Sequence, residues 1–160
     1  MARLKVTCRL MEGAGLIVDQ YVRPRFAAYV GRLFEAIVAD LFELFNQHGA
    51  LPFVYTRLGG SWWHRGGEEI DIVCLREGQS KILFCECTWQ DGVDGHRVLE
   101  ELRAKAPPHV SWQNGKREEH FCIATRTFSR RPMEDDRVSC YDLDDLTRVV
   151  ADCRKGGFSA

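Results

Sequence analysis

The clearest hydrophobic pattern in the chain lies between Phe26 and His48. Apolar residues recur there at steps of three and four, namely Leu33, Phe34, Ile37, Val38, Leu41, Phe42, Leu44 and Phe45. A period near 3.6 residues is typical of an amphipathic helix. Gly49 and Pro52 follow, and both favour a helix end at that point. We therefore predict a helix from about Phe26 to His48 with a wide apolar face.

After this helix the pattern changes to short apolar runs separated by turn residues. "EIDIVCLR" and "KILFCECTW" have the length and composition of strands, and "EGQS" between them supplies turn residues. Glu69 to Trp89 is therefore predicted to form a β-hairpin. Val93 to Ala106 then carries apolar residues at helical spacing. We expect Pro107 and Pro108 to end that helix, because proline cannot continue one.

The last third of the chain predicts two more strands and a helix. "HFCIATRTF" is a strand pattern, "SRRPMEDD" is a charged loop, "RVSCYDL" is a short strand, and a final helix runs from about Asp144 to Asp152. The order helix, two or three strands, helix, strand, strand, helix is typical of an α/β protein. It predicts a mixed central β-sheet flanked by helices.

The length of 160 residues, 45% of them hydrophobic, suits a single domain. Residues 1–24 form an N-terminal segment without a sustained period, and its structure is left open. The domain is expected to span residues 25–152, and residues 153–160 are expected to form a frayed tail.

Charge and cysteine content narrow the class of protein only slightly. Lys and Arg number 22 against 23 Asp and Glu, so the chain has no overall attraction to nucleic acid or to an anionic membrane. We see no apolar run long enough to span a bilayer and no secretory leader, so we expect a cytoplasmic protein without a membrane partner. The seven cysteines are scattered, which favours reduced core thiols over a metal cluster.

Two acids stand among apolar residues where charge is unfavourable. Asp71 lies between two isoleucines and Glu86 between two cysteines, each within a predicted strand. If these strands pair as a hairpin, side-chain alternation lets both carboxylates meet on one face. A divalent cation would relieve their repulsion, and Mg²⁺ prefers oxygen ligands. The alternative reading is that each acid pairs with a cation such as Arg57, Arg65 or Arg126, or lies at a solvated strand end.

Further candidates come from the first helix and from a late basic cluster. Glu35 lies at the edge of the apolar stripe, where it could reach over the sheet, although a Glu there is also typical of an ordinary surface position. In "TRTFSRR", Arg126, Arg130 and Arg131 cluster enough to predict contact with DNA phosphates, whereas dispersed loop charges are usually solvated.

These motifs, in this order, resemble the PD-(D/E)XK nuclease superfamily, which has the restriction-endonuclease-like fold. "YVGRLFEAIV", "WWHRGGEEIDIV", "LFCECTW" and "HFCIATRTF" are more closely similar to the C-terminal nuclease-like domain of a family of archaeal ATPases. The resemblance covers about residues 22–150. It implies a restriction-endonuclease-like core.

The resemblance also implies roles for individual residues. Glu35 would match the helix acid, while Asp71, Glu86 and the Cys87 carbonyl would bind Mg²⁺ or Mn²⁺ for hydrolysis of a DNA phosphodiester. Thr88 occupies the position of the catalytic lysine. A threonine hydroxyl can hold a water but brings no positive charge. Arg97 and Lys81 are the visible substitutes, and Lys81 is the poorer because its side chain faces the other way.

The sequence therefore leaves two functions open. The first is a metal-dependent DNA endonuclease-like domain with Glu35, Asp71, Glu86 and Thr88 at its catalytic site. The second is a catalytically inactive nuclease-fold module that binds DNA or protein or dimerises. DNA is the expected partner, and the resemblance adds a separate ATPase and a second copy of the chain as candidate partners. The sequence lacks the glycine-rich phosphate loop of an ATPase.

Overall fold

The structure is a computed structural model that describes residues 20, 23–59, 62–63, 69–133 and 135–156. The chain divides into two compact units, residues 1–33 and 34–160, whereas the sequence suggested a division after residue 24. Within the described ranges, the first unit contains the start of helix α2 (Arg23–Gln47), and the second contains every later helix and strand. The segment that the sequence left open, residues 1–24, lies almost entirely outside the described residues.

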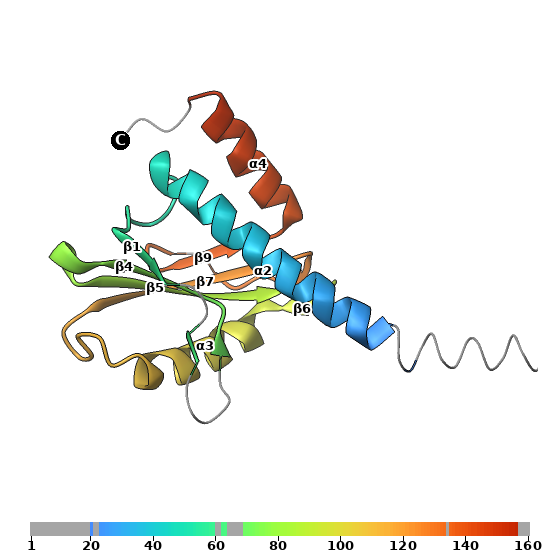
Figure 1. The fold of residues 1–160 in the computed structure, drawn as a ribbon, viewed down its shortest axis with the longest axis horizontal. Helices are drawn as coiled ribbons and strands as arrows, with labels where there is room; N and C mark the ends of the chain where they lie inside the picture. Colours follow the sequence, from blue (N-terminus) through green and yellow to red (C-terminus); the bar gives the residue numbers. More distant parts are fainter. Residues whose placement is uncertain (1–19, 21–22, 60–61, 64–68, 134, 157–160) are drawn as a thin grey trace, which may run out of the picture. The chain divides into compact units, whose positions relative to one another are not determined.

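A mixed five-stranded sheet forms the centre of the second unit, in the order β1-β4-β5-β7-β9 (Figure 1). Its strands are β1 (Arg57–Gly59), β4 (Ile72–Arg76), β5 (Lys81–Thr88), β7 (Glu118–Thr125) and β9 (Val138–Tyr141). The pairs β1/β4 and β4/β5 are antiparallel, and the pairs β5/β7 and β7/β9 are parallel. Three helices flank this sheet, so the predicted α/β fold with a mixed central sheet is confirmed.

Helices cover both faces of the sheet because its strands bury apolar residues on both sides. On one face, α2 from Phe34 onward and α4 (Leu143–Arg154) enclose a core that includes Phe42, Phe45 and Cys85. On the other face, α3 (Gly95–His109) encloses a core that includes Phe84 and Leu102 (Figure 1). None of the helices in the described ranges is long and apolar enough to cross a membrane.

The described cysteines are free thiols, and most of them are buried in these cores. Burial raises the pKa values of the Cys85 and Cys122 thiols, which lie side by side on β5 and β7. Protonated, buried thiols agree with the expectation of reduced core cysteines.

The predicted hairpin is confirmed as the pair β4 and β5. The pairing runs from Ile72 opposite Cys85 to Arg76 opposite Lys81, and a short 3-10 turn, Glu77–Gln79, connects the strands. Two short two-stranded sheets accompany the main one. They are β2 (Trp62–Trp63) with β3 (Glu69–Ile70), and β6 (Val93–Asp94) with β8 (Phe128–Arg130).

The prediction that the proline pair ends the second helix is wrong, because α3 includes both Pro107 and Pro108 in its last turn. Proline removes a backbone donor, but it leaves the carbonyl groups at the helix end available as acceptors. The buried Arg117 guanidinium donates to the carbonyl oxygens of Pro107 and Val110. This bonding satisfies the end of α3 from another element, which a local reading of the sequence cannot detect.

The beginning of α3 is also held by specific contacts, a side-chain cap and a close approach at a glycine. The Asp94 carboxylate caps the helix by accepting hydrogen bonds from the backbone N–H groups of His96 and Arg97 at 3.1 and 3.4 Å. A Cβ on Gly95 would lie 2.6 Å from Pro132 Cδ, so glycine is required for this close approach. Both features hold the helix in one register against the sheet.

Helix α4 begins with a capping box in which Asp142 and Asp145 bond each other's backbone N–H groups. The buried Asp145 carboxylate also pairs with Arg131 and Arg148. The helix continues to Arg154 and buries Cys153, so the first two residues of the predicted tail are helical.

Replacing Asp145 with Ala is expected to lower the free energy of unfolding by about 2 kcal/mol. The change removes one half of the capping box and the partner of two arginines. Asp144→Ala is the matched control, since Asp144 is an exposed acid in the same turn and should cost about 0.5 kcal/mol or less. Urea denaturation measures both variants, and equal losses would contradict the assigned role.

Candidate functional site

Asp71 lies at a one-residue break between β3 and β4, and not in the middle of a strand as the sequence pattern predicted. Its Oδ2 accepts a hydrogen bond from the backbone N–H of Cys87 at 2.7 Å. A side-chain oxygen therefore takes the place of a strand carbonyl beside β5. Because of the break, Ile70 packs in the core under α3, whereas Ile72 packs in the core under α2 and α4. The strict alternation on which the prediction relied does not continue through Asp71.

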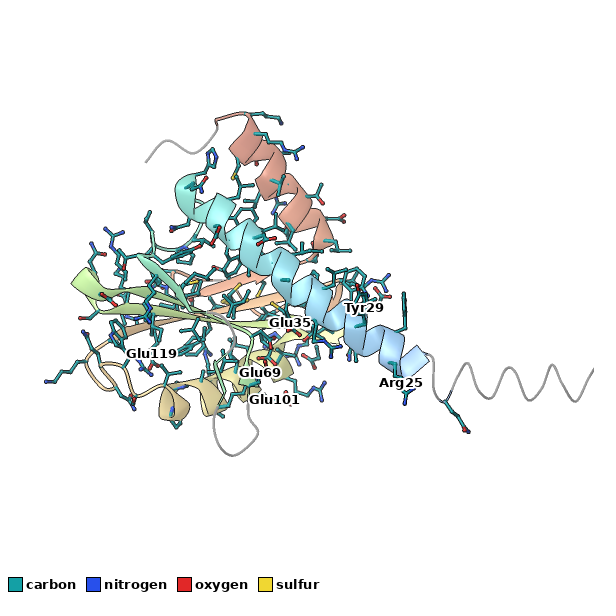
Figure 2. The ribbon with its side chains drawn as sticks, viewed as in Figure 1. Arg25, Tyr29, Glu35, Glu69, Glu101 and Glu119 are labelled. Atoms are coloured by element: carbon teal, nitrogen blue, oxygen red, sulfur yellow. The ribbon has the colours of Figure 1, made fainter. Side chains whose placement is uncertain are left out.

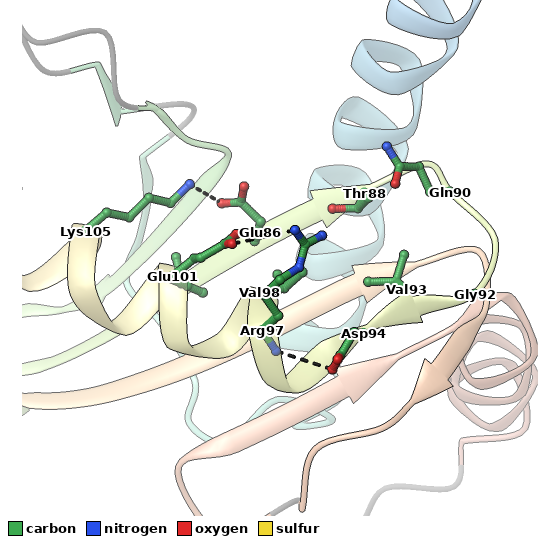
Figure 3. Close-up of a pocket in the computed structure, with 11 residues that line it drawn as sticks. Glu86, Thr88, Gln90, Gly92, Val93, Asp94, Arg97, Val98, Glu101 and Lys105 are labelled. Carbon is green, nitrogen blue, oxygen red and sulfur yellow. Dashed lines mark hydrogen bonds and ion pairs between the residues drawn. The ribbon is translucent and has the colours of Figure 1, made fainter.

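Glu86 is on the face of β5 that is turned toward α3. Phe84, two residues earlier, packs in the core under that helix. Lys105 reaches from α3 and places its Nζ 2.7 Å from Glu86 Oε2 (Figure 3). The same Nζ donates a hydrogen bond to the carbonyl oxygen of Glu69 at 2.8 Å. Lys105 therefore connects α3 both to Glu86 and to the short strand that precedes Asp71.

The charge of Glu86 acts on Asp71. Burial first, and then the negative charge of Glu86, raises the pKa of Asp71 to about 7, although the Cys87 N–H and Lys105 oppose the rise. Burial also raises the pKa of Glu86, and Lys105 is the main opposing influence there. Two acids in this state bind a proton or another cation more readily than exposed carboxylates do. The raised pKa values therefore indicate that both carboxylates are stabilised by a nearby positive charge or by a proton.

Glu35 of α2 and Glu101 of α3 add negative charge around Glu86. The charges of both are among the causes that raise the pKa of Glu86. Figure 2 labels Glu35 on α2, and Glu69 and Glu101 on β3 and α3. Glu35 thus lies near enough to Glu86 to influence its charge, and its catalytic role stays a prediction.

A pocket of about 420 Å³ opens beside Glu86 (Figure 3). It lies between the end of β5 and one side of α3, and its lining includes Thr88, Gln90, Arg97 and Lys105. Thr88 follows Glu86 on the same side of the strand, as alternation predicts. The acid, the hydroxyl and the ammonium group therefore border one polar cavity.

Binding of a divalent cation by Asp71 and Glu86 stays a prediction. Among the residues that the structure describes, no three or more His, Cys, Asp or Glu side chains are grouped so that they could hold a metal ion. Mg²⁺ is usually bound by one or two carboxylates together with water and substrate phosphate, rather than by a complete protein cage. Glu86 lines the open pocket, whereas Asp71 lies at the break before β4 and accepts the hydrogen bond of the Cys87 N–H. The Cys87 carbonyl as a further ligand stays a prediction.

The three arginines predicted to contact DNA have different surroundings. Arg131 bonds the Cys140 carbonyl oxygen and Asp145, and its guanidinium lies 5.0 Å from the centre of the Phe128 ring. Arg126 pairs with Asp91 at 3.1 Å and lies 4.9 Å from the centre of the Trp89 ring. The Arg130 side chain is exposed. Packing accounts for Arg131 without DNA, and phosphate contact by the three arginines stays a prediction.

Sequence reasoning missed Lys105. Arg57 pairs with Glu77 and Arg126 with Asp91, whereas Arg65 lies outside the described residues. The cation that meets Glu86 comes instead from α3. One signal was available, because Lys105 follows Val98 and Leu102 at helical spacing and so stands on the apolar face of its helix.

The fold and the site define an α/β protein with a mixed sheet and a half-buried acid pair on β5 and at the break before β4. The chain belongs to the DUF234 family, described as archaeal and bacterial proteins of unknown function, whose model matches residues 8–106. That range contains all the acids of the site and Lys105, whereas the three arginines follow it. No solved structure matches the chain.

A longer archaeal protein is also similar to this chain. "Uncharacterized protein MJECL04" of Methanocaldococcus jannaschii is 34% identical over 94 residues, which is 58% of this chain and 21% of that protein. The chain therefore spans about a fifth of the length of this curated relative.

Proposed function

We propose that this protein is a metal-dependent DNA endonuclease-like domain of the PD-(D/E)XK kind, with a restriction-endonuclease-like core. The observation that carries the proposal is the half-buried pair Asp71 and Glu86, whose pKa values are both raised and of which Glu86 borders a polar pocket. The resemblance of the surrounding motifs to the nuclease-like domain of archaeal ATPases supports it. Membership in a family without an assigned function leaves the proposal to be tested by experiment.

In this function, Asp71 and Glu86 would hold Mg²⁺ or Mn²⁺, with the Cys87 carbonyl as the expected further ligand. Such a cation would supply Lewis-acid chemistry, namely a lower pKa for a water molecule and stabilisation of negative charge on the phosphate. Thr88 has a hydroxyl that borders the pocket and can orient the attacking water. Water attacks the phosphorus atom, the bond to the leaving oxygen breaks, and two shorter strands result.

Asp71→Asn and Glu86→Gln are each expected to slow cleavage by about 100-fold or more, because each removes one charge that holds the cation. The purified protein is incubated with linear, single-stranded and branched DNA in Mg²⁺ or Mn²⁺, and the products are resolved on denaturing gels. Asp40→Asn serves as the matched control, since it removes an exposed charge from α2. Cleavage that persists in both site variants would mean a contaminating nuclease and would contradict the proposal.

A second candidate function is a catalytically inactive nuclease-fold module that binds DNA or protein. Two observations favour it: position 88 carries Thr where the resembled family has lysine, and Lys105 already neutralises Glu86 as a structural ion pair would. A parent protein that binds DNA without cutting it, together with a Thr88→Lys variant that cuts, would support this candidate. A separate ATPase and a second copy of the chain remain the proposed protein partners in either case.

A further inference from the structure

Lys105 is held in place by two acceptors inside the candidate site. Its Nζ lies 2.7 Å from Glu86 Oε2 and 2.8 Å from the Glu69 carbonyl oxygen, and its side chain is 21% exposed. The residue also borders the pocket, together with Thr88. An ammonium group in this position is part of the site itself and does not belong to the solvated surface.

The helix that carries Lys105 is anchored at both ends, so this position is well defined. The Asp94 cap and the close approach of Gly95 fix its start, and Arg117 bonds the carbonyl groups at its end. Leu102, one turn before Lys105, is fully buried in the core under α3. Packing therefore sets the distance between Lys105 and the acid strand.

Lys105 contacts Glu86 directly and borders the pocket that Glu86 lines. The two substitutes suggested by the sequence are placed differently. Arg97 is 72% exposed and lies 3.9 Å from Glu101, whereas Lys81 pairs with Glu118 at the far end of β5.

We propose that Lys105 is a positioning residue that supplies, from helix α3, the positive charge that Thr88 does not provide. It fixes the orientation of Glu86 and places an ammonium group beside the pocket where water would attack the phosphate. The inference rests on the proposed function. It adds that Lys105 gives the site its positive charge although position 88 carries threonine.

The test moves the lysine between the two positions. Single-turnover DNA cleavage at saturating Mn²⁺ is compared for the parent, Lys105→Met, and the double variant Lys105→Met with Thr88→Lys. We expect Lys105→Met to be slower by about 100-fold or more, and the double variant to recover to within about tenfold of the parent. Arg103→Met is the matched control, because it removes an exposed cation from the same helix outside the pocket.

A second measurement is independent of cleavage. Titration with Mn²⁺ alone, followed by calorimetry, is expected to show binding about threefold tighter or more in Lys105→Met, because the ammonium no longer repels the cation. Tighter binding with slower cleavage is a combination that loss of a merely structural contact does not produce. Lys105→Arg, which keeps the charge, should retain more of the rate than Lys105→Met.

Three results would overturn the inference. In the first, the parent cleaves DNA and Lys105→Met cleaves within about threefold of its rate; the proposed function would then still stand. In the second, the double variant folds but its cleavage rate does not recover. The third is equal losses in Lys105→Arg and Lys105→Met. A parent that does not cleave refutes the proposed function instead, and the inference with it, so the two failures are distinguishable.

Discussion

Asp71→Asn is expected to make the metal-free protein more stable than the parent at pH 8 by about 2 kcal/mol, with almost no difference at pH 4. Burial raises the pKa of Asp71 to about 7 in the folded protein, whereas an unfolded Asp has a pKa of about 3.9. Between these values the folded state binds more protons than the unfolded state. The contribution of Asp71 to stability is therefore present below about pH 4 and is lost as the pH rises through about 7.

Asparagine removes the buried charge but keeps an oxygen that can accept the Cys87 N–H hydrogen bond. Urea denaturation in EDTA at pH 4, 5, 6, 7 and 8 measures the free energy of unfolding of both proteins. Asp40→Asn is the control, because this exposed acid should leave the pH dependence unchanged. A constant difference between variant and parent at every pH would show that the pKa of the Asp71 carboxyl is not raised as described.

For the same variant we expect that added metal changes the order of response: Mn²⁺ should stabilise the parent more than Asp71→Asn. Adding Mn²⁺ at pH 8 should raise the stability of the parent, because the cation binds the folded state and relieves the repulsion between Asp71 and Glu86. It should raise the stability of Asp71→Asn much less. Asp71→Asn should therefore be more stable than the parent in EDTA, and its free energy of unfolding should rise less when Mn²⁺ is added.

Phe84→Ala is expected to lower the free energy of unfolding by about 3 to 5 kcal/mol. The Phe84 side chain is fully buried between the sheet and α3, where its ring centre lies 5.7 Å from that of Phe121 and 5.4 Å from the Arg117 guanidinium. Removing the ring leaves a cavity in the core and removes a contact of the arginine that bonds the end of α3. Urea denaturation at pH 7 measures the loss.

Met133→Ala provides the control, because the Met133 side chain is 86% exposed and its removal should cost about 0.5 kcal/mol or less. Phe84 stands two residues before Glu86 on the same face of β5, so its loss also weakens the support of the candidate site. A loss below about 1 kcal/mol would mean that neighbouring side chains refill the space.

Much of the fold was predictable from local patterns. The helix α2, the hairpin of β4 and β5, and the α/β class followed from apolar periods of 3.6 and 2, which depend only on neighbouring residues. The end of α3 was not predictable, since Arg117 reaches the carbonyl groups of its last turn from a later segment. Local rules for proline describe a helix in isolation, and tertiary hydrogen bonds can satisfy the carbonyl groups that are open at a helix end.

The acids of the candidate site were also predictable, because charge among apolar residues is unfavourable without a partner. Their geometry was predicted only in part. The break at Asp71 turns its carboxylate toward the Cys87 N–H, and a pattern of strict alternation cannot reveal this. From the sequence we named Arg97 and Lys81 as substitutes for the missing lysine, because both are close to Glu86 along the chain.

The sequence by itself determined the class of fold and the two acids, because periodicity and misplaced charge are properties of short segments. Only the tertiary structure decided which cation meets Glu86, because Lys105 lies on a different element, 19 positions further along the chain. The packing of α3 against the sheet brings its ammonium group to 2.7 Å from Glu86 Oε2. The pocket therefore receives a positive charge from Lys105 although position 88 carries threonine, and the fold, not the strand motif, determines this.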